Sequence, residues 1–286
     1  MRQIAIASLV GCVLSVFLTC AHSHRAFAAD DCCTPEATRT IAAKAGFVDV
    51  VGIKLGMPVK EAMAAIKKHN QRLQVSTPNP MRFKSLPNVT FAANVNAQVM
   101  DGKPFESIQL SVTMPPNEDV VWYVKRMVEF EGDAKPSEAN VLASLRQKYG
   151  QEHGRMDPIN TQPLSQLYWM FDANGKPVPE QQAKQIIRHC MLSNNQSDLA
   201  EVSVSTPKRW IVNNINCGEV TMVTANGQLT VPGAGTPGSV SRLLVVAYNE
   251  LLHRSAFEAS HAMIWQAEKH QADKEQQKMD QVKPVL

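Results

Sequence analysis

The sequence lacks the signatures that usually reveal an enzyme directly. It contains no Gly-x-Ser-x-Gly, His-Glu-x-x-His or P-loop pattern, which argues against the common serine hydrolases, zinc proteases and nucleotide-binding proteins. Aromatic residues make up only 6% of its 286 residues, and neither sign of charge predominates, with 29 basic against 26 acidic residues. Nucleic acid and anionic membranes both require a concentrated basic surface, so neither is an expected partner.

A long apolar run occurs only at the N-terminus. A basic residue, this apolar stretch and a final Ala-Phe-Ala have the order of a secretory signal peptide, so we expect residues 1–28 to be removed. The alternatives are an uncleaved anchor, because the run approaches the ~20 residues that span a bilayer, and lipid attachment at Cys20, which the preceding Thr19 disfavours. The next longest run, Leu243–Tyr248, fits one buried strand. We therefore expect a periplasmic or secreted protein with no membrane span after signal removal.

Four cysteines remain after the signal: Cys32, Cys33, Cys190 and Cys217. An even number in an oxidising compartment is typical of disulfides, and three pairings are open. A bond between the adjacent Cys32 and Cys33 would be strained, because their Cα atoms are only ~3.8 Å apart. A Cys190–Cys217 bond closes a loop of about 26 residues and is worth about 3 kcal/mol. We predict this bond, which leaves Cys32 and Cys33 to each other; the alternative joins one of them to Cys190 or Cys217.

The first half of the mature chain combines a helix pattern with a clear hairpin pattern. Residues 50–70 predict a short strand, a tight turn at Gly56 and a helix with Pro58 in its first turn. From Val89 to Val99 apolar and polar residues alternate, Asp101-Gly102 supplies a turn, and alternation resumes from Ile108 to Met114. This predicts two antiparallel strands with one buried and one wet face.

The second half repeats the order of helix followed by strand. We expect a helix from Ser137 to Gly150, a strand with an Asn-Gly turn over 165–178, and a helix near 180–191. Strands at 200–206, 209–215 and 219–225, a loop at 226–239, a central strand at 240–249 and a long helix with a solvated, fraying end follow. The predicted fold class is α+β, an antiparallel sheet with helices on one face. Its expected units are 29–130, 131–249 and the C-terminal helix at 250–286.

Two stretches resemble the repeat of small exported α+β modules. They are Gly52–Asn70, and Lys135–Gly150 followed by Leu167–Val178, with a Gly-Met turn opening a helix and a Tyr-Gly helix end before an aromatic strand. Together they cover about a third of the mature chain. They resemble the β-lactamase-inhibitor-protein fold and the small outer-membrane lipoproteins of the barrel-assembly machinery. The resemblance implies helices packed on an antiparallel sheet and a binding role, and it assigns no functional residue.

One polar, uncharged strand face is the candidate binding surface. Its members on the two hairpin strands are Asn94, Asn96, Gln98, Gln109, Ser111 and Thr113. Such a surface suits hydrogen-bonded contacts, although one solvated face is also ordinary for an antiparallel sheet. We therefore expect a non-catalytic binding protein of a bacterial-type envelope, with an envelope protein or peptide as its partner.

The alternative is an enzyme of the hydrolase type with an active site that matches no motif. It would need a pocket that joins His153 or His189 to several carboxylates. His253 and His261 lie too far apart along one helix, by about 12 Å of rise, to share a metal ion. No Cys-x-x-Cys spacing occurs either, so no metal or cofactor is expected. Trp122 and Tyr123, on a strand or a helix, are more commonly core residues than ligand contacts.

Overall fold

A computed structural model describes residues 34–76, 80–83, 86–101, 104–155, 164–190, 219–230 and 238–281. The expected signal peptide, Cys32, Cys33, Cys217 and the strands expected at 200–206 and 209–215 lie outside these ranges. Cys190 ends a described helix, but its side chain also lies outside the description. The disulfide assignments therefore stay predictions.

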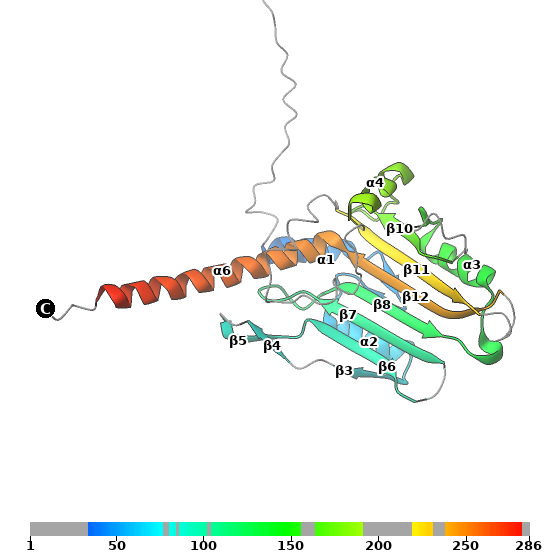
Figure 1. Ribbon diagram of the computed structural model, residues 1–286, viewed down its shortest axis with the longest axis horizontal. Helices are drawn as coiled ribbons and strands as arrows, with labels where there is room; N and C mark the ends of the chain where they lie inside the picture. The colour runs from blue at the N-terminus through cyan, green and yellow to red at the C-terminus, as the bar shows by residue number, and fades with distance from the viewer. Residues whose placement is uncertain are drawn as a thin grey trace, which may run out of the picture.

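One antiparallel sheet of eight strands forms the body of the protein, in the order β3-β6-β7-β8-β12-β11-β10-β9 (Figure 1). Its strands are β3 (Leu73–Ser76), β6 (Asn94–Val99), β7 (Phe105–Val112), β8 (Val121–Glu129), β9 (Gly154–Arg155), β10 (Leu167–Phe171), β11 (Thr221–Leu229) and β12 (Val240–Asn249). Separate hairpins are formed by β1 (Asp49–Val50) with β2 (Ile53–Lys54) and by β4 (Met81–Phe83) with β5 (Leu86–Phe91).

The helices are α1 (Pro35–Ala45), α2 (Val59–His69), α3 (Glu138–Tyr149), α4 (Glu180–Cys190), α6 (Glu250–Asp280) and the short 3-10 helix η1 (Gly132–Ala134). Together with the antiparallel sheet, they confirm the predicted α+β fold class. Ser137 caps α3 as expected, because its hydroxyl accepts a hydrogen bond from the Asn140 amide at 3.2 Å. Gly150 follows the helix with φ of 83°, a backbone conformation that favours glycine.

The order of a helix followed by strands of the large sheet occurs twice. In the first half α2 precedes β3, β6, β7 and β8, and in the second half α3 precedes β9, β10, β11 and β12. The halves meet where β8 pairs with β12, over Tyr123–Glu129, so β12 is an interior strand, as expected from its apolar sequence. The expected boundary at residues 130 and 131 falls between β8 and α3, and the sheet is continuous across it.

Helices α2 and α3 lie on one face of this sheet, which we call the covered face. Cross-strand neighbours on this face are Leu110, Val124, Ala247, Val223 and Trp169, one from each of five adjacent strands. All five are buried, as are Ala62 and Ile66 of α2 and Val141 and Leu145 of α3. The apolar side of each helix, set by the 3.6-residue period, packs on the apolar face of the strands, set by the two-residue period, and this contact forms the main core.

The chain ends of the described region pack on each other rather than on the sheet alone. Thr34 caps α1 by accepting a hydrogen bond from the Ala37 amide, and Thr38 on α1 hydrogen-bonds Ser255 on α6 at 3.0 Å. Asn249 caps α6 by accepting from the Leu252 amide at 2.7 Å. The second half of α6 extends away from the sheet, and its residues beyond 267 are exposed (Figure 1). The expected solvated tail is therefore helical up to Asp280.

Three sequence expectations are corrected. The alternating stretch Val89–Val99 is not one strand, because β5 pairs with β4 and only β6 joins β7 in the large sheet. The phenyl rings of Phe83 and Phe91 instead stack in a small cluster against α6. Residues 226–229 continue β11 rather than beginning a loop. The N-terminal helix α1 was not expected at all, because few large apolar residues mark its buried side.

Candidate functional site

The sheet face opposite α2 carries side chains that stay in contact with solvent. We call it the open face and define it by Asn96, Gln98, Ser107, Gln109, Lys125, Met127 and Leu244. Two rows of cross-strand neighbours build it, because Asn96 pairs with Gln109 and Gln109 with Lys125, while Gln98 pairs with Ser107, Ser107 with Met127 and Met127 with Leu244. In Figure 1 this face is seen in front of α2, which lies behind β6 and β7.

The structure brings most of the predicted polar residues together. Asn94 pairs with Ser111 in the same register, and the Ser111 hydroxyl donates a hydrogen bond to Asn94 Oδ1 at 2.8 Å. Ser111 itself is buried. Together with Asn96, Gln98 and Gln109 these two residues form one continuous strip along β6 and β7.

Thr113 does not join this strip. The register shifts between Ser111 and Val112, which ends the regular alternation of faces there. The Thr113 hydroxyl is buried, donates to the Glu118 carbonyl and accepts from the Val120 amide. Thr113 therefore holds the turn between β7 and β8 and offers no hydroxyl to a partner.

Sequence reasoning missed the part of the open face that β8 and β12 supply. Lys125, Met127 and Leu244 are half-buried and lie in the middle of the sheet. A two-residue period in β8 would have placed Lys125 and Met127 on one face, but the segment also fitted a helix. The pairing of β8 with β12 joins residues that are far apart in the sequence, so no local pattern indicates it.

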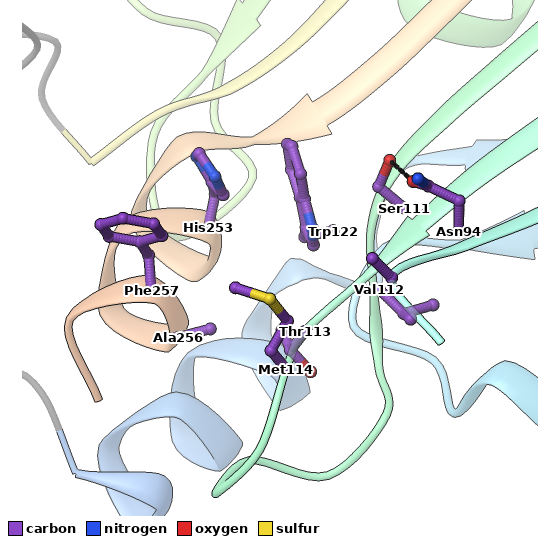
Figure 2. Close-up of a pocket in the computed structure, with 10 residues that line it drawn as sticks. Asn94, Ser111, Val112, Thr113, Met114, Trp122, His253, Ala256 and Phe257 are labelled. Atoms are coloured by element: carbon purple, nitrogen blue, oxygen red, sulfur yellow. Dashed lines mark hydrogen bonds between the residues drawn. The ribbon is translucent and has the colours of Figure 1, made fainter. Parts of the chain in front are cut away.

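A hollow adjoins the open face where α6 begins (Figure 2). It contains about 340 Å³ of empty space, part of which is open solvent. Its walls come from the ends of β6, β7 and β8 and from the first turns of α6, and its lining residues are Ala93, Asn94, Ser111, Val112, Thr113, Met114, Trp122, His253, Ala256 and Phe257. Asn94 and Ser111 thus belong both to the polar strip and to the hollow.

The aromatic wall of the hollow is the stack of Trp122 on His253. Their ring centroids are 4.0 Å apart with an angle of 18° between the planes, and Phe257 packs at 6.3 Å from the imidazole. Although His253 keeps some solvent contact, burial of its imidazole lowers its pKa to about 4. The imidazole is therefore neutral at pH 7. The lining residues also include no lysine, arginine, aspartate or glutamate.

A cluster of polar side chains around Glu106 lies on the covered face, and its members hydrogen-bond to one another. The buried Glu106 carboxylate accepts hydrogen bonds from Asn70 at 2.9 Å and from Arg126 at 2.7 Å, and lies 2.8 Å from His69 Nε2. Burial alone would raise the pKa of Glu106, but Asn70, Arg126 and His69 together lower it. This cluster joins the C-terminal end of α2 to β7 and β8, so its role is structural.

His153 does not form the pocket that a hydrolase would need. Its Nδ1 accepts a hydrogen bond from the Met170 amide at 3.2 Å, and its Nε2 lies 2.6 Å from the Val178 carbonyl and donates to it. Both nitrogens are thus engaged by backbone. The side chain of His189 lies outside the described residues. Within the described ranges, no three histidine, cysteine, aspartate or glutamate residues are arranged to hold a metal ion.

The fold also argues against a nucleotide-binding role for one glycine-rich segment. Gly233, Gly235 and Gly238 have the spacing Gly-x-Gly-x-x-Gly, but the segment connects the antiparallel strands β11 and β12. A dinucleotide-binding glycine loop connects a strand to a helix, whose N-terminus receives the phosphates. The spacing alone therefore indicates no nucleotide site.

Comparison with known proteins identifies no relative, since no family model, curated protein or solved structure matches this chain. The resemblance to exported α+β modules thus stays a prediction. Within the described ranges, no helix combines the length and the apolar character needed to cross a membrane.

Proposed function

We propose that the protein is an exported, non-catalytic α+β protein of a bacterial-type envelope that binds a protein or peptide through its open face. The observation that carries this proposal is the composition of that face. Met127 and Leu244 lie side by side at its middle, and amide and hydroxyl groups of Asn96, Gln98, Ser107 and Gln109 surround them on one side. An apolar centre with a polar rim is the usual anatomy of a protein interface.

The charge of this surface favours a neutral partner segment. Lys125 is the one charged residue among the seven that define the open face. At the far end of the face the side chains of Arg242 and Glu129 pair at 2.5 Å, which balances their charges locally. Uncharged side-chain amides donate and accept hydrogen bonds equally well, as the backbone of a peptide or the surface of a folded partner requires.

Site-specific photo-cross-linking in the living host tests this proposal. A benzoylphenylalanine residue placed at Gln98 or Ser107 should give one discrete covalent adduct with an envelope protein. The matched control is the same residue at Lys60, which is exposed on α2 over the covered face, and it should give no such adduct. Equal cross-linking from both faces, or none from the open face, would contradict the proposed role.

A further inference from the structure

We infer that the partner segment on the open face places one acidic side chain, Asp or Glu, against Lys125 and is otherwise uncharged. This inference rests on the proposed function and names the chemistry of the partner. It follows from the surroundings of Lys125, from its partial burial and from its position on the open face.

Lys125 has no acidic neighbour on the sheet. The strand register surrounds it with eight residues on this face, which are Tyr123, Met127, Gln109, Val246, Ser107, Ser111, Leu244 and Tyr248. None of them carries a carboxylate, and no ion pair among the described residues involves Lys125. Burial raises the pKa of Tyr123 to about 12, so its phenol stays neutral at pH 7 and supplies no negative charge.

The carboxylates in the neighbouring strands are paired elsewhere. Glu129 lies on the same face of β8, but it is four residues away, about 13 Å along the strand, and its carboxylate pairs with Arg242. Glu106 of β7 lies on the covered face and accepts a hydrogen bond from Arg126 there. The positive charge of Lys125 is therefore uncompensated within the described part of the chain.

The partial burial of Lys125 makes an opposite charge from the partner favourable. Lys125 is half-buried, and its neighbours Tyr123 and Val246 are buried. A segment bound over the open face removes more water from the ammonium group, and a charge without water or a counter-charge is costly. A carboxylate of the partner supplies that counter-charge, and less water screens the pair there than at the exposed surface.

The position of Lys125 favours an acidic side chain over the carboxyl terminus of a peptide. Lys125 shares a cross-strand row with Gln109 and Asn96, and the rows of Asn94 and Gln98 lie on either side of it. A segment that contacts all three rows passes Lys125 and continues beyond it. The negative charge therefore comes from a residue inside the segment.

The test selects peptides from a random library displayed on phage. Selection on the unmodified protein should return peptides that share Asp or Glu at one fixed position. Selection on Lys125→Glu should return Lys or Arg at that position, because the substitution reverses the charge that the peptide meets. The matched control Lys60→Glu makes the same change at an exposed position of α2, over the covered face, and should keep the acidic preference.

A selected peptide, made synthetically, then measures the contact itself. Replacing its shared acid by the matching amide, Asp by Asn or Glu by Gln, should raise the Kd for the unmodified protein at least about tenfold. For Lys125→Gln the same replacement should change the Kd less than about twofold, because both changes remove one contact. For Lys60→Gln it should keep its full effect.

Carbodiimide cross-linking gives a result that needs no protein variant. The reagent joins a carboxylate to an amine that it touches, so mass mapping should find the peptide acid linked to Lys125. A link to another lysine and none to Lys125 would overturn the inference, even if the variants at Lys125 do not fold.

An uncharged substitution separates this inference from the proposed function. Ser107→Trp places a bulky neutral side chain on the open face and should raise the Kd of the selected peptides at least about tenfold. A library that yields no peptide sensitive to Ser107→Trp would contradict the open-face proposal and the inference together. Peptides that Ser107→Trp blocks, but whose binding shows no acidic preference dependent on Lys125, would overturn the inference while the open-face proposal stands.

Discussion

Trp122 of β8 and His253 of α6 stack ring on ring, with centroids 4.0 Å apart and planes inclined by 18°. The contact fixes the first turns of the long helix against the sheet and at the same time forms the wall of the hollow. The pair is one of several contacts that position α6, together with the hydrogen bond between Thr38 and Ser255 and the one that Asn117 donates to the Ala256 carbonyl.

Burial of the His253 imidazole makes the free energy of unfolding decrease as the pH falls. The pKa of His253 is lowered from an ordinary value of 6.5 to about 4, so the unfolded chain binds the proton more readily. Its contribution to stability is complete above pH 6.5 and is lost as the pH falls towards 4. Between pH 7 and pH 5 the loss should be about 2 kcal/mol.

Urea unfolding at the two pH values measures this effect, with His253→Phe as the comparison. Phenylalanine keeps a ring against Trp122 but does not titrate, so the variant should lose about 2 kcal/mol less than the unmodified protein between pH 7 and pH 5. The same pH dependence in both proteins would mean that His253 is not buried against Trp122 as described.

Glu106 is expected to be the most costly carboxylate to neutralise. Glu106→Gln leaves Arg126 without its counter-charge, and we expect a loss of about 2 kcal/mol in the free energy of unfolding, because Arg126 and His69 are each about a quarter exposed. The matched control is Glu129→Gln, which breaks a more exposed pair with Arg242 and should cost less than about 1 kcal/mol. Chemical denaturation at pH 7 measures the free energy of unfolding of the two variants. Equal losses would show that the ion pair of Glu106 with Arg126 stabilises the protein no more than an exposed ion pair does.

Alanine substitutions at Gly52 and Gly56 distinguish the stability cost of backbone strain from the cost of a steric clash. Gly52 and Gly56 have φ of 85° and 79°, but a Cβ atom at Gly56 would lie 1.9 Å from the Ala42 carbonyl oxygen, whereas one at Gly52 meets nothing within 4 Å. Gly52→Ala should cost about 1 kcal/mol, from backbone strain alone. Gly56→Ala should cost at least about 4 kcal/mol or prevent folding, because the contact is with backbone. Thermal unfolding of both variants tests whether α1 packs against Gly56, because Ala42 belongs to α1. Equal decreases in the melting temperature of the two variants would contradict this packing.

How far the sequence predicts this fold depends on the range of each interaction. The hairpin of β6 and β7, the capped helix α3 and the interior strand β12 follow from local periodicity, turn residues and caps, and all three are confirmed. Thr34 and Pro35 also form a helix-start signal. Helix α1 was nevertheless missed, because Thr38, Ala42 and Ala45 form a buried side too small to stand out in a hydrophobic pattern.

The candidate site was predictable only in part for the same reason. Asn94, Asn96, Gln98, Gln109 and Ser111 lie on one face because strand alternation and a single hairpin place them there. The hollow depends on α6 returning to the ends of β7 and β8, a long-range contact that no local pattern encodes. Thr113 was assigned to the wrong environment because a bulge at Ser111 and Val112 is invisible in an alternating sequence.

The predicted Cys190–Cys217 disulfide is open to direct test. Peptide mapping of the purified protein without reductant should recover the two cysteines in one linked fragment, and loss of the bond in Cys217→Ser should cost about 2–4 kcal/mol. Replacing both Cys32 and Cys33 by serine should cost much less. A fragment that links Cys32 or Cys33 to Cys217 would overturn the pairing and tie the N-terminal segment to the second half of the chain.

One affinity measurement shows whether the open face binds a partner. The partner captured by cross-linking is titrated calorimetrically with the unmodified protein, with Gln98→Lys combined with Met127→Lys, and with the control Lys60→Gln on α2. If the partner binds the open face, the open-face variant should raise the Kd at least about a hundredfold, because two buried charges would remain without partners, and the control should leave the Kd unchanged. An unchanged Kd for the open-face variant, in a protein that unfolds at the same denaturant concentration as the original, would show that the partner does not bind the open face.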